Sequence, residues 1–148
     1  MPKFALAVPF PGLVEPVGVD NDLPAHVTVL VPCPGEATAV AEVLAPFGPF
    51  DVTFPRLERF SELVWLAPEP PEPFIALTEA MVERFPEYPP YGGIHDRIVP
   101  HLTVAKTELD GTAALVEPRL PLLSRAETVV LYEHVEAKHW RELETFVL

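Results

Sequence analysis

Cysteine is almost absent from this chain of 148 residues, which contains only one, Cys33. A single cysteine excludes an internal disulfide and a zinc site built on cysteines. Cys33 follows the apolar run Val27–Val31 and precedes Pro34, a setting typical of a small residue packed in a core. Because the sequence singles out no histidine partner for a nucleophilic role, we interpret Cys33 as a packing residue.

Basic residues are also few. Ten lysines and arginines stand against twenty-two acidic residues, and the formal net charge is −12. A protein that binds many phosphates of a long RNA usually carries a basic stripe, whereas the basic residues here are scattered. The composition therefore favours a small substrate, or a local positive pocket within an acidic surface. It does not exclude RNA ends.

Long hydrophobic runs are missing as well. No apolar run approaches the ~18 residues that a membrane span needs. The N-terminal run Phe4–Val8 is broken by Pro9 and Pro11, and it lacks the continuous apolar stretch and cleavage site of a signal peptide. We therefore expect a cytoplasmic protein.

Apolar residues and prolines are abundant. Apolar residues make up 49% of the chain, enough for a single domain with a sizeable core, and the twenty prolines mark rigid turns between periodic segments. The apolar patterns predict strands at Phe4–Val8, His26–Pro32, Pro49–Leu57, Leu63–Ala67, His101–Lys106, Thr128–Val135 and Arg141–Leu148. They predict helices at residues 36–46, at Pro73–Phe85, and from Asp110, as its cap, to Pro118. The intervening loop Pro86–Val99 is long enough to be functional.

The order of elements repeats along the chain. When the sequence is aligned with itself at an offset of 75 residues, identical residues coincide at several positions. The pairs include Thr28 with Thr103, Val29 with Val104, Glu42 with Glu117, Pro46 with Pro121 and Thr53 with Thr128. Trp65 also aligns with Trp140, although that pair depends on the register of the last strands. Duplicated strands, helices and hairpins predict an α+β fold with two pseudo-twofold lobes. We expect two small antiparallel sheets, flanked by helices, around a central cleft.

Each half of the repeat carries one copy of a short motif. The copies are His26-Val-Thr28-Val and His101-Leu-Thr103-Val, and each lies in a predicted strand. Side chains two residues apart in a strand point to the same face, so each histidine shares a face with its threonine. The apolar residues of each motif then face the core. A twofold arrangement would bring two histidines and two threonines into one cleft.

That set of side chains suits phosphodiester hydrolysis. A neutral imidazole can activate water and a protonated imidazole can protonate the leaving oxygen, since an unperturbed histidine has a pKa of about 6.5. Two hydroxyls can donate hydrogen bonds to the non-bridging phosphate oxygens. This chemistry requires no metal or other cofactor, so we predict none.

The chain resembles the 2′-5′ RNA ligase family within the 2H phosphoesterase superfamily. The stretches that carry the resemblance are Pro24-Ala-His-Val-Thr-Val-Leu30, Phe85-Pro-Glu-Tyr-Pro-Pro-Tyr-Gly-Gly93 and Val99-Pro-His-Leu-Thr-Val-Ala105. The resemblance extends over nearly the whole chain. It implies a bilobal α+β fold, metal-independent action on 2′,3′-cyclic phosphates or 2′-5′ linkages, and catalytic positions at His26, Thr28, His101 and Thr103.

Other residues are candidates for substrate binding. Arg97 and Lys106 flank the second motif and could supply positive charge, or could be ordinary surface charges. Tyr88 and Tyr91 could stack a base or pack within the proline-rich loop. His95 and Asp96 could suggest a metal, but no further ligands are suitably spaced and threonines are poor metal ligands.

Three functions stay open at this point. The first is a cyclic phosphodiesterase that acts on small cyclic-phosphate nucleotides or RNA 3′ ends. The second is a 2′-5′ RNA ligase, which runs the reverse reaction. The third is a non-catalytic nucleotide- or RNA-binding module, which the presence of both histidines disfavours. We expect no membrane partner and no obligate protein partner.

Overall fold

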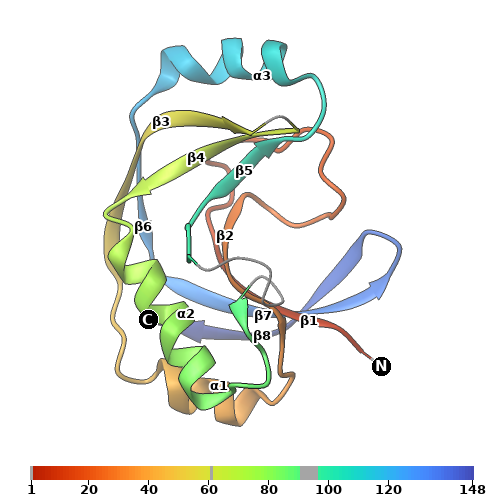
Figure 1. Cartoon of the computed structure of the whole chain (residues 1–148), viewed down its shortest axis with the longest axis vertical. Helices are drawn as coiled ribbons and strands as arrows, with labels where there is room; N and C mark the ends of the chain where they lie inside the picture. Colours follow the sequence, from red (N-terminus) through yellow and green to blue (C-terminus); the bar gives the residue numbers. More distant parts are fainter. Residues whose placement is uncertain (1, 61, 91–96) are drawn as a thin grey trace.

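The computed structural model describes residues 2–60, 62–90 and 97–148. It has an α+β fold built on one curled, eight-stranded sheet in the order β6-β3-β4-β5-β2-β1-β7-β8, with antiparallel neighbours throughout (Figure 1). The strands are β1 Phe4–Pro9, β2 His26–Cys33, β3 Phe50–Phe60, β4 Leu63–Glu69, β5 Leu102–Ala105, β6 Leu122–Ala126, β7 Thr128–Glu136 and β8 His139–Val147. The helices are α1 Ala37–Leu44, α2 Glu72–Arg84 and α3 Leu109–Val116.

The sequence predictions are confirmed for seven strands and three helices, with small shifts at their ends. Strand β3 continues to Phe60, beyond the predicted end at Leu57. Its exposed side carries charged residues, and Arg56 there binds Glu58 and Glu69. The sequence does not predict strand β6, because five residues with a serine and an arginine give a weak pattern. Asp110 is in the first turn of α3 and does not cap it.

The expectation of two separate sheets is wrong. Strands β2 and β5 pair at Val27 and Leu102, and this pairing joins the two halves into one continuous sheet. Both side chains are fully buried. From this junction outward the order is β5-β4-β3-β6 on one side and β2-β1-β7-β8 on the other. Trp65 in β4 and Trp140 in β8 therefore do not occupy equivalent places.

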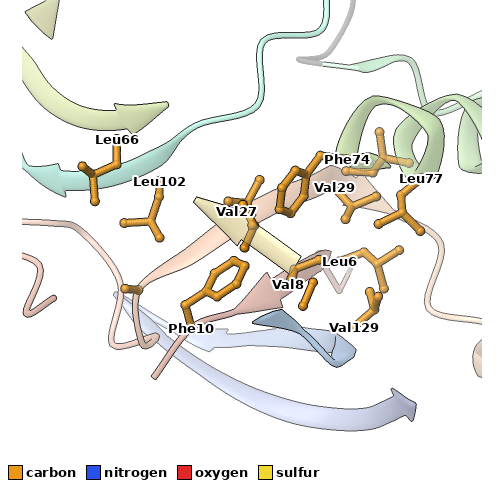
Figure 2. Packing of buried hydrophobic residues seen from close by; sticks show 14 of the residues in the cluster. Leu6, Val8, Phe10, Val27, Val29, Leu66, Phe74, Leu77, Leu102 and Val129 are labelled. Carbon is orange, nitrogen blue, oxygen red and sulfur yellow. The ribbon is translucent and has the colours of Figure 1, made fainter. Parts of the chain in front are cut away.

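One large core fills the inside of the curled sheet. Side chains from β1, β2, β4, β5 and β7 form this core together with Phe74 and Leu77 of α2 (Figure 2). Thr78 is also buried, and its hydroxyl donates to the carbonyl of Val29 at 2.8 Å, which anchors α2 on β2. Cys33 lies in this core, as predicted, and burial raises the pKa of its thiol to about 12. None of the helices in the described ranges is long and apolar enough to cross a membrane.

Candidate active site

The two motifs meet at the junction of β2 and β5. His26 is the first residue of β2, and His101 directly precedes β5. The antiparallel register set by Val27 and Leu102 places Thr28 across from His101 and His26 across from Thr103. All four side chains therefore share the face opposite the core, where each is half-buried. We call His26, Thr28, His101 and Thr103 the quartet.

Both histidines are held by the same local hydrogen bond. Nδ1 of His26 lies 2.8 Å from the carbonyl oxygen of Pro24, and Nδ1 of His101 lies 2.9 Å from that of Val99. A carbonyl oxygen can only accept a hydrogen bond, so Nδ1 carries a proton in both rings. Nε2 is then the nitrogen that gains and loses a proton. The two imidazoles are therefore equivalent in tautomer.

The surroundings of the two histidines differ. Burial lowers the pKa of His26 below its usual value. The hydrogen bond to Pro24 opposes this effect, and the nearby His101 adds to it by charge repulsion. His26 is accordingly neutral at pH 7, with Nε2 free to accept a proton.

Two hollows open beside the quartet, and Thr28 lines both. The first has a volume of about 140 Å³ and is lined by His26, Thr28, Thr103, Pro16, Val19, Asn21 and Lys106. The second has a volume of about 160 Å³ and is lined by Thr28–Val31, Phe74, Thr78, Pro90, Ile98, Pro100 and His101. The first is therefore the more polar hollow and carries a cation, whereas the second is largely apolar.

The segment between β1 and β2 forms one wall of the polar hollow. It is attached to β5 by two backbone hydrogen bonds, from Val17 to Val104 and from Lys106 to Val17, and by the ion pair of Lys106 with Asp20 at 3.2 Å. Its other end is attached to the β7–β8 hairpin, because Asp22 accepts hydrogen bonds from His139 and from the backbone of Trp140. The sequence pattern assigns no role to this segment, which lacks regular secondary structure.

An aromatic residue that the sequence did not single out also adjoins the quartet. Trp65 of β4 is the direct strand partner of Thr103, so it lies on the same face. Its ring meets that of His101 at a centroid distance of 5.9 Å, with the ring planes at 76°. Phe60 stacks on the other side of Trp65 at 5.4 Å. No signal in the sequence pointed to Trp65, because this contact depends on the pairing of β4 with β5.

The remaining predicted binding residues have different positions. Lys106 lines the polar hollow, next to His26, Thr28 and Thr103. Arg97 is exposed and lines neither hollow. The structure does not bring Tyr88 to the quartet, because its ring packs against the hydrophobic core. Tyr91, and the metal candidates His95 and Asp96, lie outside the described residues.

Metal ligands do not cluster in the part of the chain that the structure describes. No group of three or more His, Cys, Asp or Glu side chains is placed there so that it could hold a metal ion. The polar groups around the hollows are instead imidazoles, hydroxyls, one amide and one ammonium group.

Comparisons with known proteins agree with this fold. Residues 17–138 match the family model of the 2′-5′ RNA ligase superfamily. No curated protein matches the sequence. Among solved structures, Escherichia coli LigT in complex with 3′-AMP is similar over 100% of this chain and 99% of its own, with 17% identity and a TM-score of 0.67. TT0787 of Thermus thermophilus is similar over 99% of this chain and 97% of its own, with 21% identity and a TM-score of 0.63.

A structure described as a phosphoesterase gives a similar result. It matches 99% of this chain and 98% of its own, with 20% identity and a TM-score of 0.63. These identities support a common fold, and the family match covers most of the sequence, including both motifs. The chain therefore belongs to the 2′-5′ RNA ligase superfamily of 2H phosphoesterases.

Proposed function

We propose that the protein is a metal-independent phosphodiesterase that hydrolyses 2′,3′-cyclic phosphates by acid–base catalysis with His26 and His101. One observation carries the proposal. Two imidazoles with the same tautomer lie on one sheet face together with two threonine hydroxyls, at the junction where the two halves of the sheet pair. This arrangement provides a base, an acid and two hydrogen-bond donors for one phosphate.

The hydrolysis needs two proton transfers. His26, neutral because it is buried, accepts a proton from water as the water oxygen bonds to phosphorus. His101 donates a proton to the ribose oxygen as its bond to phosphorus breaks. The product is a nucleoside monophosphate. In ligation a ribose 5′-hydroxyl takes the place of water as the nucleophile on the cyclic phosphate, so His26 accepts its proton and His101 again protonates the leaving ribose oxygen.

The threonines act on the phosphate itself. Thr28 lies across from His101 and Thr103 lies across from His26, so a phosphate between the histidines meets both hydroxyls. Their hydrogen bonds strengthen as negative charge builds on the non-bridging oxygens. Lys106, at the edge of the same hollow, is paired with Asp20, so it adds a partly offset positive charge near the phosphate.

The sizes of the hollows and the comparisons support a small nucleotide as substrate. Two hollows of about 140 and 160 Å³ are small for ligand sites, which favours a single nucleotide over an extended chain. LigT, which has the same fold, has been crystallised with 3′-AMP, with ATP and with NADP+. We therefore favour a cyclic mononucleotide or a related small cyclic phosphate over a long RNA.

A second candidate function is the joining of RNA termini through a 2′-5′ linkage. A linear diester carries an organic group on each side of its phosphate, whereas a cyclic phosphate carries one. The two hollows share Thr28 and are otherwise lined by different residues, which favours room for two such groups. Arg97 is exposed, four residues before His101 in the chain, and could meet a longer substrate.

We also infer that the domain consists of two lobes related by duplication. The motif recurs in the two central strands, β2 and β5, and β1 and β4 occupy matching places beside them. Strands β7 and β3, which align at the offset of 75 residues, take the next places outward. The two lobes form one domain because the central strands pair and share one core.

Product analysis in the presence of EDTA tests the proposed function. The substrates are the four nucleoside 2′,3′-cyclic phosphates and ADP-ribose 1″,2″-cyclic phosphate. We expect turnover of at least one, and we expect His26→Ala and His101→Ala each to lose activity by a factor on the order of 10²–10⁴. His134→Ala, a histidine on the β7–β8 hairpin, is the matched control and should retain activity.

Other outcomes would point elsewhere. Activity that disappears in EDTA and returns with zinc or manganese would contradict the metal-independent mechanism. Faster joining of RNA ends than hydrolysis would favour the ligase. Nucleotide binding without turnover would indicate the non-catalytic module.

A further inference from the structure

Three aromatic rings form a row that ends at His101. Phe60 and Trp65 are stacked, with centroids 5.4 Å apart and planes at 26°. Trp65 then meets His101 nearly at a right angle, at 76° and 5.9 Å. Edge-to-face contacts of this kind are attractive and orient the rings relative to each other. The row therefore connects the exposed tip of the β3–β4 hairpin with the quartet.

His101 has less support from its own backbone than His26. His26 belongs to β2 and is paired with Pro9 of β1, whereas His101 precedes β5 in a stretch without regular structure. Its side-chain hydrogen bond in the described structure joins Nδ1 to Val99, two residues earlier in that same stretch. A side contact from a rigid strand would limit rotation of the His101 ring further.

Trp65 is placed to make that contact. It pairs with Thr103 in the ladder between β4 and β5, and its side chain is 8% exposed. Phe60, which is 58% exposed, covers its outer side. The indole is thus confined between the ring of Phe60 and the ring of His101.

The chemistry of Trp65 suggests that stability is not the reason for a tryptophan here. Its indole Nε1 is buried and has no hydrogen-bond partner in the described structure. A buried donor without a partner destabilises a fold, so a leucine or phenylalanine would fill the position at lower cost. The indole ring has the size to reach His101 from β4.

We infer that Trp65 is a positioning residue for His101. Its ring fixes the side-chain rotamer of His101, and the Val99 carbonyl fixes the tautomer, so that Nε2 is directed at the leaving oxygen of the substrate. The inference rests on the proposed function for its catalytic consequence. The position of the imidazole itself can be measured without any substrate.

Kinetics of two Trp65 variants provide the first test. Trp65→Leu should lower kcat on the order of 10–100-fold with little change in KM, because a misplaced acid slows the chemical step and leaves binding intact. Trp65→Phe keeps an aromatic ring of shorter reach and should lower kcat by a smaller factor than Trp65→Leu. Phe60→Ser, at an exposed site that leaves the core unchanged, should lower kcat by a smaller factor.

The second test uses nuclear magnetic resonance of the histidine rings. In Trp65→Leu the ring resonances of His101 should shift and broaden, while those of His26 stay sharp. Trp140→Leu is the matched control, because Trp140 meets His134 at 5.0 Å and 63° on the edge hairpin. This control should alter the His134 signals and leave kcat unchanged.

The two tests separate the inference from the proposed function. A wild-type protein that turns over no cyclic phosphate contradicts the function, and the resonances still decide whether Trp65 orders His101. Full activity of Trp65→Leu, with His101 resonances that shift through loss of the indole ring current and stay as sharp as in the wild type, would overturn the inference. An equal loss of kcat in Trp65→Phe and Trp65→Leu would also overturn it, because the indole N–H rather than the aromatic ring would then be the group that matters.

Discussion

At the scale of single residues, the two copies of the motif have the same sequence pattern and different surroundings. Each histidine donates Nδ1–H to a carbonyl two residues earlier. His26 is set in a paired strand and is desolvated, whereas His101 depends on a contact from Trp65. Identical motifs therefore need not have identical roles, and burial favours His26 as the base.

The first prediction concerns the pH dependence of activity. Burial lowers the pKa of His26, so His26 stays an unprotonated base down to a pH below the usual value of about 6.5. We expect the acidic limb of kcat/KM to lie below a pH of about 6.5. Titration of the His26 ring by nuclear magnetic resonance should give the same midpoint, and a midpoint above the usual value would contradict the assignment of His26 as the base.

The same shift affects stability. The unfolded chain binds a proton at His26 more readily than the folded chain does, so acidification below about pH 6.5 lowers the free energy of unfolding. Replacement of His26 by Gln should remove this part of the pH dependence. Denaturant unfolding of the wild type and of His26→Gln between about pH 5 and about pH 7 measures this difference in the free energy of unfolding.

The second prediction concerns the threonines. Thr28→Val and Thr103→Val keep the side-chain shape and remove a donor, and each should lower kcat by a factor on the order of 10–10³. Thr145→Val on the exposed face of β8 is the matched control. Steady-state kinetics measure the effect. A covalent phosphothreonine in a mass spectrum would instead identify a nucleophile.

At the scale of elements, the segment between β1 and β2 shapes the polar hollow without any regular structure of its own. Gly18 allows this segment to lie close to β5. Its φ of +69° is in the left-handed region, and an added Cβ would collide with the side chain of Thr107. The segment can therefore approach β5 closely only with glycine at this position.

The third prediction compares two glycines of this segment. Gly12 also has a positive φ, of +82°, but an added Cβ there meets no atom within 4 Å. Gly12→Ala should cost about 1 kcal/mol of stability, through the backbone alone. Gly18→Ala should lower Tm further and should raise KM, because the wall of the hollow shifts. Equal Tm and KM for the two variants would show that the contact with Thr107 does not matter.

At the scale of the whole molecule, charge and shape favour small substrates. The net charge is −12, and five of the ten basic side chains bind carboxylates in the described structure. Lys106 is one of these five, since it pairs with Asp20 at the rim of the polar hollow. A long RNA meets repulsion from such a surface over a range of about 8 Å at physiological salt.

The fourth prediction follows from this charge distribution. A cyclic mononucleotide should have a higher kcat/KM than an RNA oligomer that ends in the same cyclic phosphate. The rate for the mononucleotide should depend only mildly on salt, because few counterions are released. Measurement of kcat/KM for both substrates across a salt series tests this. A preference for the oligomer with a steep salt slope would favour the ligase.

Most of the local structure could be predicted from the sequence. Alternation and helical spacing locate β1, β2, β4, β7 and all three helices within a few residues. The pattern failed at β6 and at the end of β3, where charged and polar residues belong to edge or exposed positions. Such residues resemble turns in the sequence because burial, which produces the pattern, is weak there.

The site was predictable only in part, for a physical reason. A strand alternates its side chains, so the sequence alone determined that each histidine shares a face with its threonine and that Val27 and Leu102 turn to the core. Tertiary structure decided that β2 and β5 pair, that one sheet results, and that Trp65, Lys106 and the segment before β2 adjoin the quartet. These contacts join residues far apart in the chain, and pairing between distant strands leaves no periodic signal in either one.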